Sequence, residues 1–401
     1  MPDEKMSLWG KFADKVRRFF DLPRNVKLLG WTSLFTDIGS EMILPILPLF
    51  LKGALGAPIW AIAFIEGVAE ATANGVKLLS GALADRLGRS KPFVYLGYGL
   101  STIVKPVLAM APTWHFVLGV RFVDRIGKGF RTAPRDAIVA TSTPEEQFGK
   151  AYGFHRTMDT TGALIGGTIA MVVMWFVADV NSFAIRWMFA LSVVPCLAAM
   201  FFIVPVTEEG AVPEPGKDLR LMFDFPLQVW LLMAGITLWE LGNISYALVL
   251  LRINDLGVAA RYVPVVYFAY NLVYLAVAMP MGMLSDKYGI KAGLLITPFL
   301  GAAAFWTLGA PTQWVAVAGG IFLYALHSAA INTLPRAAVA HFGAPGARGT
   351  LFGLVGVCAF LGNVLAGQIW QRVDSATAMR VAGALSLLAI VPFSLLKSKP
   401  R

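Results

Sequence analysis

GALADRLGRSK, residues 81–91, recurs 201 positions later as GMLSDKYGIK, residues 282–291. Three further pairs of landmarks recur at offsets of 200 to 203, and the landmarks have the same order in both halves of the chain. They are Asp37-Ile38-Gly39 with Glu240-Leu241-Gly242, Pro134-Arg135 with Pro335-Arg336, and Gly162 and Gly167 with Gly362 and Gly367. Four landmarks in one order at nearly constant spacing indicate an internal repeat, so we predict two copies of one structural unit.

The sequence around the repeat is too apolar for a soluble protein. Apolar residues make up 57% of the 401-residue chain and charged residues 14%, whereas soluble domains carry about 25% charged residues. A helix needs about 20 apolar residues to cross a bilayer. Such stretches occur near 28–51, 58–82, 92–112, 115–141, 148–177, 183–205, 225–251, 262–285, 291–309, 314–341, 346–370 and 378–397. We therefore predict an all-α polytopic membrane protein with twelve transmembrane helices in two pseudo-symmetric six-helix bundles.

The repeat and the spans divide the chain into five parts. We expect a cytoplasmic N-terminal segment (1–27), a first bundle (28–205), a polar Pro/Gly-containing linker (206–224), a second bundle (225–397) and a short tail (398–401). In the first part, apolar residues alternate with basic ones at helical spacing, which predicts a helix lying in the membrane interface. Those residues are Leu8, Phe12, Val16 and Phe19, opposite Lys11, Lys15 and Arg18.

The basic residues predict the orientation. With both termini inside, 19 of the 34 Lys and Arg residues fall in cytoplasmic segments, as the positive-inside rule requires. This distribution accounts for the net charge of +10 and leaves no basic patch for nucleic acid. We expect a multi-pass protein of the plasma (cell inner) membrane, monomeric, with both termini cytoplasmic. Cys196 and Cys358 fall inside predicted spans and are interpreted as packing residues.

The fourth span carries a dense charged stretch, VDRIGKGFRTAPRDAIVA, residues 123–140. At about 100° per residue, its charged residues fall within an arc of about 140°, which predicts one charged helix face. They are Arg121, Asp124, Arg125, Lys128, Arg131, Arg135 and Asp136. Because an isolated charge in lipid costs at least a few kcal/mol, we expect this face to meet water or opposite charge inside the bundle.

The second half lacks this cluster. Positions 125, 128 and 131 correspond to Leu326, Ala329 and Asn332. Groups repeated in both halves suit shared gating, whereas groups present in only one half suit coupling and substrate binding. Acidic partners are available in the first half at Asp37, Glu41, Glu66, Glu70 and Asp159.

Residues 81–91 resemble the loop signature of the major facilitator superfamily, G-x-L-x-D-R-x-G-R-[RK]. Arg125 to Arg131 resemble the fourth-span motif of that superfamily, R-x-x-Q-G-x-G, with Lys128 in place of Gln and Arg131 in place of the second Gly. GALIGGTIA in span five is similar to the exporter signature G-x-x-x-G-P-x-x-G-G, but Gly167 stands where Pro is expected. The resemblance implies a transporter with alternating access, in which Asp85 caps a neighbouring helix and pairs with Arg86 or Arg89. The gating residues would be Gly81, Asp85, Arg86, Gly88, Arg89, Arg135, Asp286 and Arg336.

A proton-coupled carrier needs a carboxylate in a water-accessible cavity beside a cation. Asp37 and Glu41 are the first candidates, with Arg125 or Arg131 as the competing cation, and a permanent salt bridge between spans one and four is the alternative. Glu66, Glu70 and Asp159 are further coupling candidates, although Glu66 and Glu70 suit plain pairing with Lys77 and Lys105 equally well. The substrate-binding candidates are Arg125, Lys128, Arg131, His155, Glu240, His327 and Asn332.

We predict a proton-coupled secondary transporter of a small, anionic or zwitterionic amphipathic solute, with export by proton antiport favoured. Uptake of an organic anion by proton symport, lipid or lysolipid flipping, metal-ion export and a non-transporting sensor are the alternatives. His155 and Asp159 with Glu66 suit a metal poorly, because no Cys is nearby and the chain has four His. Neither a phosphate loop nor a Ser/His/Asp grouping is found, so no cofactor and no enzymatic activity are expected. The expected partners are the substrate, protons and the bilayer.

Overall fold

The computed structural model describes residues 21–176, 183–208, 225–244, 246–257, 263–310 and 314–397. These residues form helices, turns and bends, with no strand among them. The predicted interfacial helix and most of the predicted linker lie outside the described residues. The boundaries of the five predicted parts therefore stay predictions.

Helices of the first half follow the predicted spans closely. They are α2 (Arg24–Glu41), α3 (Leu47–Gly53), α4 (Ile59–Leu87), α5 (Lys91–Ala109), α6 (Trp114–Thr141), η1 (Glu145–Gln147), α7 (Phe148–Phe176), α8 (Phe183–Leu191) and α9 (Val193–Ile203). Span one is broken between α2 and α3, where Pro45 and Pro48 follow the last turn of α2. Proline lacks an N–H and restricts the residue before it, so a helix ends readily there.

The second half repeats this order. Its helices are α10 (Leu227–Leu241), α11 (Tyr246–Asp255), α12 (Val263–Tyr288), α13 (Ile290–Gly309), α14 (Trp314–Phe342), η4 (Pro345–Ala347), α15 (Arg348–Arg372), α16 (Ser375–Leu388) and α17 (Ile390–Ser394). Even the short 3₁₀ helices η1 and η4 correspond. The element order therefore confirms the predicted all-α, two-fold repeated fold.

Seven helices within the described ranges are long and apolar enough to cross a membrane, by length and composition. The remaining predicted spans are either broken into two helices, as α2–α3 and α10–α11 are, or carry the charged residues described below. Apolar side chains such as Trp175, Phe176 and Phe201 are more than three-quarters exposed on the outer surface. Such a surface fits a protein whose solvent is lipid.

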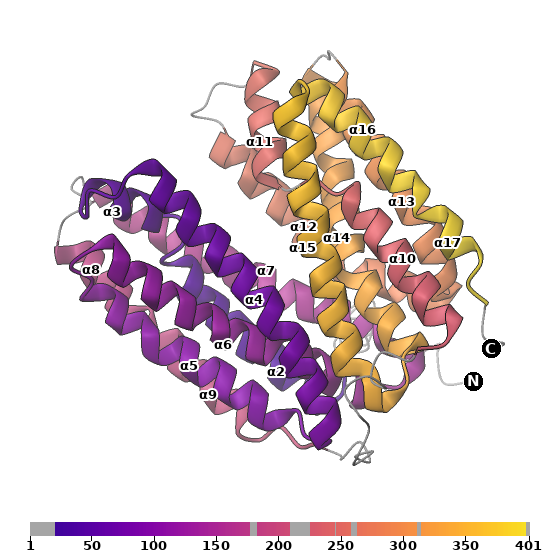
Figure 1. Cartoon of the computed structure of the whole chain (residues 1–401), viewed down its shortest axis with the longest axis horizontal. Helices are drawn as coiled ribbons and strands as arrows, with labels where there is room; N and C mark the ends of the chain where they lie inside the picture. Colours follow the sequence, from indigo (N-terminus) through magenta and orange to yellow (C-terminus); the bar gives the residue numbers. More distant parts are fainter. Residues whose placement is uncertain are drawn as a thin grey trace, which may run out of the picture.

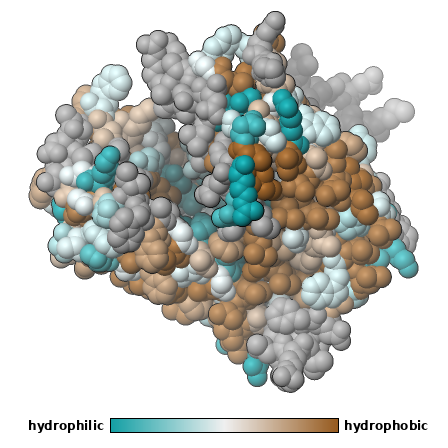
Figure 2. All heavy atoms as spheres, turned by 45° about the horizontal axis from the view of Figure 1, so that its top comes forward, coloured by the Kyte–Doolittle hydropathy of each residue, from teal (hydrophilic) through white to brown (hydrophobic). Residues whose placement is uncertain are grey.

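The two halves touch at one end of the molecule and diverge toward the other (Figure 1). We call the closed end the terminal end, because Asp21 and Leu396, which lie near the two ends of the described chain, are found there. The Gly88–Ser90 turn and Gly289 lie at the same end. Two repeat-related helix pairs cross between the halves, α4 with α15 and α7 with α12. The space-filling view is turned toward the end where the halves diverge. It shows a hollow between the halves that contains hydrophilic side chains (Figure 2).

Glycines let the helices cross at the terminal end. A Cβ built on Gly81 would lie 2.1 Å from the carbonyl oxygen of Gly349, and one on Gly282 would lie 1.8 Å from that of Gly149. No side chain fits at these distances, so each crossing depends on its glycine pair.

Candidate functional site

A cavity of about 90 Å³ lies inside the first half, between α2, α5 and α6. It is lined by five basic and three acidic residues, with apolar residues and Ser40 between them. The charged residues are Lys105, Arg121, Arg125, Lys128 and Arg131, and Asp37, Glu41 and Asp124. We call this space the charged cavity. It brings together the predicted coupling residues of span one and the predicted cationic face of span four.

Asp124 neutralises part of the basic wall. Its carboxylate lies 4.0 Å from Lys105 Nζ, 3.8 Å from Arg121 and 3.7 Å from Arg125 Nε. The guanidinium of Arg131 donates to the Ser101 hydroxyl at 2.9 Å and lies 4.4 Å from the centroid of the Tyr98 ring. The Asp124 carboxylate therefore partly neutralises three bases, whereas Arg131 contacts the neutral side chains of Ser101 and Tyr98.

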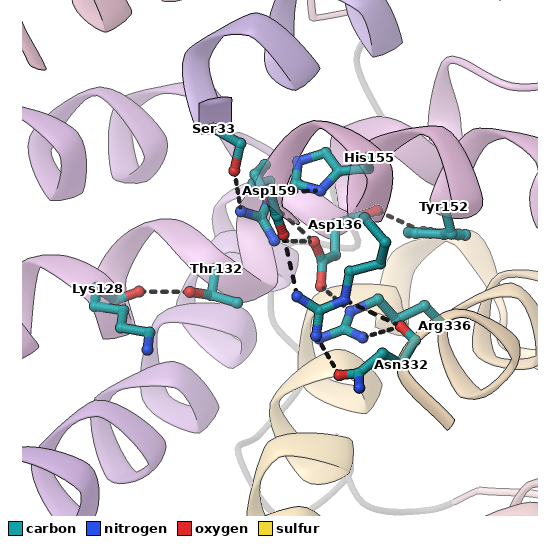
Figure 3. A network of polar contacts seen from close by, with 11 residues as sticks. Ser33, Lys128, Thr132, Asp136, Tyr152, His155, Asp159, Asn332 and Arg336 are labelled. Atoms are coloured by element: carbon teal, nitrogen blue, oxygen red, sulfur yellow. Dashed lines mark hydrogen bonds and ion pairs between the residues drawn. The ribbon is translucent and has the colours of Figure 1, made fainter. Parts of the chain in front are cut away.

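Lys128 is different, because its ammonium has no such partner. Among the described residues no carboxylate lies within ion-pair distance of Lys128, and none of the bases lies that close to Asp37 or Glu41. Figure 3 shows the Lys128 amine ending away from the neighbouring ion-pair network. A permanent salt bridge between spans one and four is thus absent from the described part, although the opposite charges share one cavity.

Two glycines of the exporter-like signature place α7 against the two carboxylates. A Cβ on Gly162 would lie 3.1 Å from the Asp37 Cβ, and one on Gly166 would lie 2.9 Å from the Glu41 Cβ. The equivalent Gly362 packs on Glu240 in the second half, at 2.8 Å from its Cβ. The signature glycines therefore set how closely span five approaches the acidic residues of span one.

A second group of charges joins the two halves (Figure 3), and its α6 members lie nearer Thr141, the last residue of that helix, than the cavity-lining bases do. Asp136 accepts from Arg135 at 2.9 Å and from Arg336 of the second half at 3.1 Å. Arg156 donates to Asp159 at 3.1 Å and also to the side-chain oxygen of Asn332. We call these six residues, with His155, the inter-half network.

The inter-half network contains several residues that we predicted as coupling, substrate or gating groups. His155 is 3% exposed, and its Nδ1 lies 3.5 Å from Asp159. Arg135 also donates to the Ser33 hydroxyl at 3.1 Å. His155, Asp159 and Asn332 therefore lie among fixed partners, and none of them is in the lining of the charged cavity.

The remaining second-half candidates also lie away from the charged cavity. Glu240 is 6% exposed and accepts from the Asn243 amide at 3.0 Å. His327 is fully buried with its ring centroid 5.9 Å from Trp239 and 5.4 Å from Phe305. Both belong to the interior of the second bundle.

Of the two acidic residues predicted to act in span two, the structure describes the side chain of Glu70. Glu70 is exposed and accepts from Asn74 at 3.3 Å, so it pairs with neither Lys77 nor Lys105. The side chain of Glu66 lies outside the described residues.

The loop-signature aspartates cap helices of the opposite half. Asp85 accepts from the backbone N–H of Gly349 at 2.9 Å and from Thr350 at the start of α15. Asp286 accepts from the N–H groups of Gly149 and Lys150, both at 2.8 Å, at the start of α7. Carboxylates are favourable at a helix N-terminus, so each one stabilises contact between the halves. In the described part of the chain, no ion pair joins Asp85 to Arg86 or Arg89.

Asp85 lies beyond the predicted end of its span, at residue 82. Burial at the contact raises the pKa of its carboxyl to about 6, although the donors of Thr350 and Gly349 lower it. The closed terminal end therefore binds a proton more tightly than a hydrated Asp85 would.

Residue types and helical phase alone did not single out the roles of Asp124, Asp136, Arg156 and Lys77. Asp124 and Asp136 were visible as members of the charged stretch, and their pairing with specific bases depends on which helices pack together. The repeat offers one signal, because Asp136 directly follows the repeated Pro-Arg pair.

The sequence profile described as Major Facilitator Superfamily matches residues 29–251 and 230–401. An uncharacterized MFS-type transporter of Methanocaldococcus jannaschii is 29% identical over 370 residues, which cover 88% of this chain and 89% of that protein. The multi-drug resistance efflux pump PmrA of Streptococcus pneumoniae is 26% identical over 290 residues, covering 69% and 70%.

Solved structures give the same fold. The human organic anion transporter MFSD10 (TETRAN) superposes with a TM-score of 0.72 at 17% identity, over 93% of this chain and 99% of that one. The proton:xylose symporter XylE gives a TM-score of 0.75 at 15% identity, over 94% and 96%. With the profile spanning both halves of the repeat, the chain belongs to the Major Facilitator Superfamily and is a membrane transporter of that family.

Proposed function

We propose that the protein is a proton-coupled exporter of small amphipathic zwitterions, located in the plasma membrane with both termini cytoplasmic. The observation that carries this proposal is the charged cavity, in which five bases face three acids and Asp37, Glu41 and Lys128 have no ion-pair partner among the described residues. A cavity with unneutralised groups of both signs suits a substrate that carries both signs.

The coupling follows from electrostatics. The anionic group of a zwitterion would bind Lys128 and Arg125, while its cationic group would compete with protons for Asp37 and Glu41. Because the cation and the proton need the same carboxylates, binding of one releases the other, and this competition is the requirement for antiport. With the carboxylate protonated, the transporter would then return to its starting conformation without substrate.

The apolar body of such a substrate has a suitable partner in the second half. Tyr246, Tyr267, Tyr270 and Tyr324 form a row of aromatic rings with centroid separations of 5.2, 6.3 and 5.3 Å. Tyr267 is close enough to Glu41 to interact with it electrostatically across the halves. The name of PmrA, an efflux pump, supports export of organic compounds.

Proton symport of a plain organic anion is the second candidate, and the excess of two bases in the charged cavity favours it. Protonation of Asp37 or Glu41 would add to the positive charge and strengthen the binding of an anion, so proton and substrate would move together. The name of MFSD10, an organic anion transporter, is consistent with this alternative.

The test uses two fluorescent probes of similar size, zwitterionic ε-dansyl-lysine and anionic dansylglycine, in proteoliposomes with an imposed pH gradient. We expect ε-dansyl-lysine to move against the proton flux, and Asp37→Asn to abolish gradient-driven accumulation while exchange of the probe continues. Glu146→Gln, an exposed carboxylate outside the cavity, is the matched control. Co-transport of dansylglycine with protons would favour symport, and full accumulation by Asp37→Asn would remove Asp37 from the coupling role.

A further inference from the structure

The two repeat-related contacts between the halves are alike over their first two turns. Beyond the Gly81–Gly349 and Gly149–Gly282 pairs, a Cβ on Gly353 would lie 2.6 Å from the Leu78 Cα. In the other contact, a Cβ on Gly153 would lie 2.7 Å from the Met279 Cα. The backbones thus meet in the same way in α4–α15 and α12–α7.

Further from the terminal end, the two contacts differ in how they hold a cation. By the repeat, Lys77 of α4 and Gly356 of α15 correspond to Ala278 of α12 and Arg156 of α7. Each contact therefore has one cation and one small residue, with the positions exchanged. Arg156 is anchored by Asp159 at 3.1 Å and by Asn332.

Lys77 has no such anchor. Its side chain is 8% exposed and lies across Gly356, where a Cβ would be 2.7 Å from Lys77 Cδ and 2.9 Å from Nζ. Within the described ranges, its Nζ donates no hydrogen bond and meets no carboxylate at ion-pair distance. The Lys77 amine is thus mostly covered by the α4–α15 contact and has no partner among the described residues.

The charged groups that face Lys77 come from four other helices, and bases outnumber acids. They are Arg135 and Asp136 of α6, Arg156 of α7, Arg336 of α14 and Glu240 of α10. Both acids already have partners, since Asp136 accepts from two arginines and Glu240 accepts from Asn243. The surroundings therefore do not compensate a further positive charge.

Removing an unpaired ammonium from water costs several kcal/mol, whereas a neutral amine costs far less. We propose that Lys77 is a proton-exchanging switch for closure of the terminal end. Its ammonium loses one proton to water when α4 packs on α15, and the neutral amine takes one proton back when these helices part. This inference concerns the closure step and does not depend on the proposed substrate.

The test measures the distance between spin labels at Leu87→Cys on α4 and Ala344→Cys beside η4, in protein in which Cys196 and Cys358 are replaced by Ala. The measurement runs from pH 7 to 9, above the pKa of about 6 of Asp85, and without any substrate. We expect the ratio of closed to open protein to rise with pH, by up to about tenfold per unit, because closure releases one proton.

Two substitutions separate charge from size. Lys77→Met, with a neutral side chain of similar length, is expected to keep the terminal end closed at every pH and to remove the pH response. Lys77→Arg keeps its charge at these pH values, so the terminal end is expected to stay open. Lys77→Gln, a second neutral variant, is expected to behave as Lys77→Met does and keeps the test decisive should the Met variant fail to fold.

The controls are Lys52→Met, which removes an exposed lysine, and Arg156→Lys, which keeps its carboxylate partner. Both are expected to keep the pH response of the parent protein. An unchanged pH response in Lys77→Met and Lys77→Gln, or closure of Lys77→Arg equal to that of the parent, would overturn the proposal.

Discussion

The first and second halves share a backbone plan but differ in the charge they hold at mid-membrane. Gly81 and Gly282 cross the opposite half in the same way, and Asp85 and Asp286 both cap a helix of the opposite half. In contrast, α6 directs Arg125, Lys128 and Arg131 into the charged cavity, where α14 has Leu326, Ala329 and Asn332. The shared parts lie where the halves close on each other, and the unshared parts lie where a solute would bind.

The largest expected effect comes from breaking a shared part. Gly81→Ala puts a methyl group 2.1 Å from the Gly349 carbonyl oxygen, and relief of such a clash costs about 3 kcal/mol. We expect the closed population of the terminal end to fall about 100-fold, as read by the Leu87–Ala344 label distance. Gly75→Ala on the same helix meets no atom within 4 Å and should leave the distance unchanged. An equal effect of both substitutions would show that the glycine contact does not control closure.

The next effect comes from an unshared part. Lys128→Ala gives the first half the residue of the second half and removes the unpaired ammonium from the charged cavity. A hydrogen bond to a charged group contributes about 2 kcal/mol, so we expect the Kd of ε-dansyl-lysine to rise about 30-fold in a fluorescence titration. Lys52→Ala is the control for removal of an exposed lysine. Unchanged affinity in Lys128→Ala would place the substrate elsewhere.

The smallest effect sharpens the role of the shared aspartates. The pKa of Asp85 is about 6 in the closed terminal end and near its ordinary value of about 4 once the end opens. The closed end therefore binds the proton of Asp85 more tightly. On acidification from pH 7 to 5, Asp85 should contribute up to about tenfold in favour of closure, against the opposite contribution of Lys77. Asp85→Asn should remove this contribution, so its closed population should be lower at pH 5, relative to pH 7, than that of the parent protein, again measured by the label distance. An equal pH response in Asp85→Asn and in the parent protein would assign the contribution to another group.

Much of the architecture could be predicted because membrane-spanning helices are recognisable in the sequence as long apolar stretches. The twelve spans, the repeat and the charged face of α6 follow from hydropathy, spacing and helical phase. The signature residues Gly81 and Asp85 were identified by resemblance. Their contact with the N-terminal turn of α15 could not be predicted from the sequence. Contacts between halves depend on three-dimensional packing of segments more than 200 residues apart.

The division of the charged residues into two sites was also beyond sequence reasoning. Helical phase puts Arg131 and Arg135 on one face, yet Arg131 lines the charged cavity and Arg135 joins the inter-half network. Similarly, His155 and Lys128 were grouped as substrate residues, whereas the depth of each along its helix separates them. Which cation remains unpaired depends on the position of every nearby carboxylate, and no local pattern records it.

The competition of a substrate cation and a proton for Asp37 and Glu41 is the central claim, and proton release on binding tests it most directly. Calorimetric titration of ε-dansyl-lysine into the purified protein, in two buffers of different ionisation enthalpy, counts the protons exchanged. The account predicts release of about one proton per bound zwitterion at a pH where the carboxylates are protonated, and none in the double variant Asp37→Asn, Glu41→Gln. Binding without proton release in the parent protein, or with proton uptake, would contradict it.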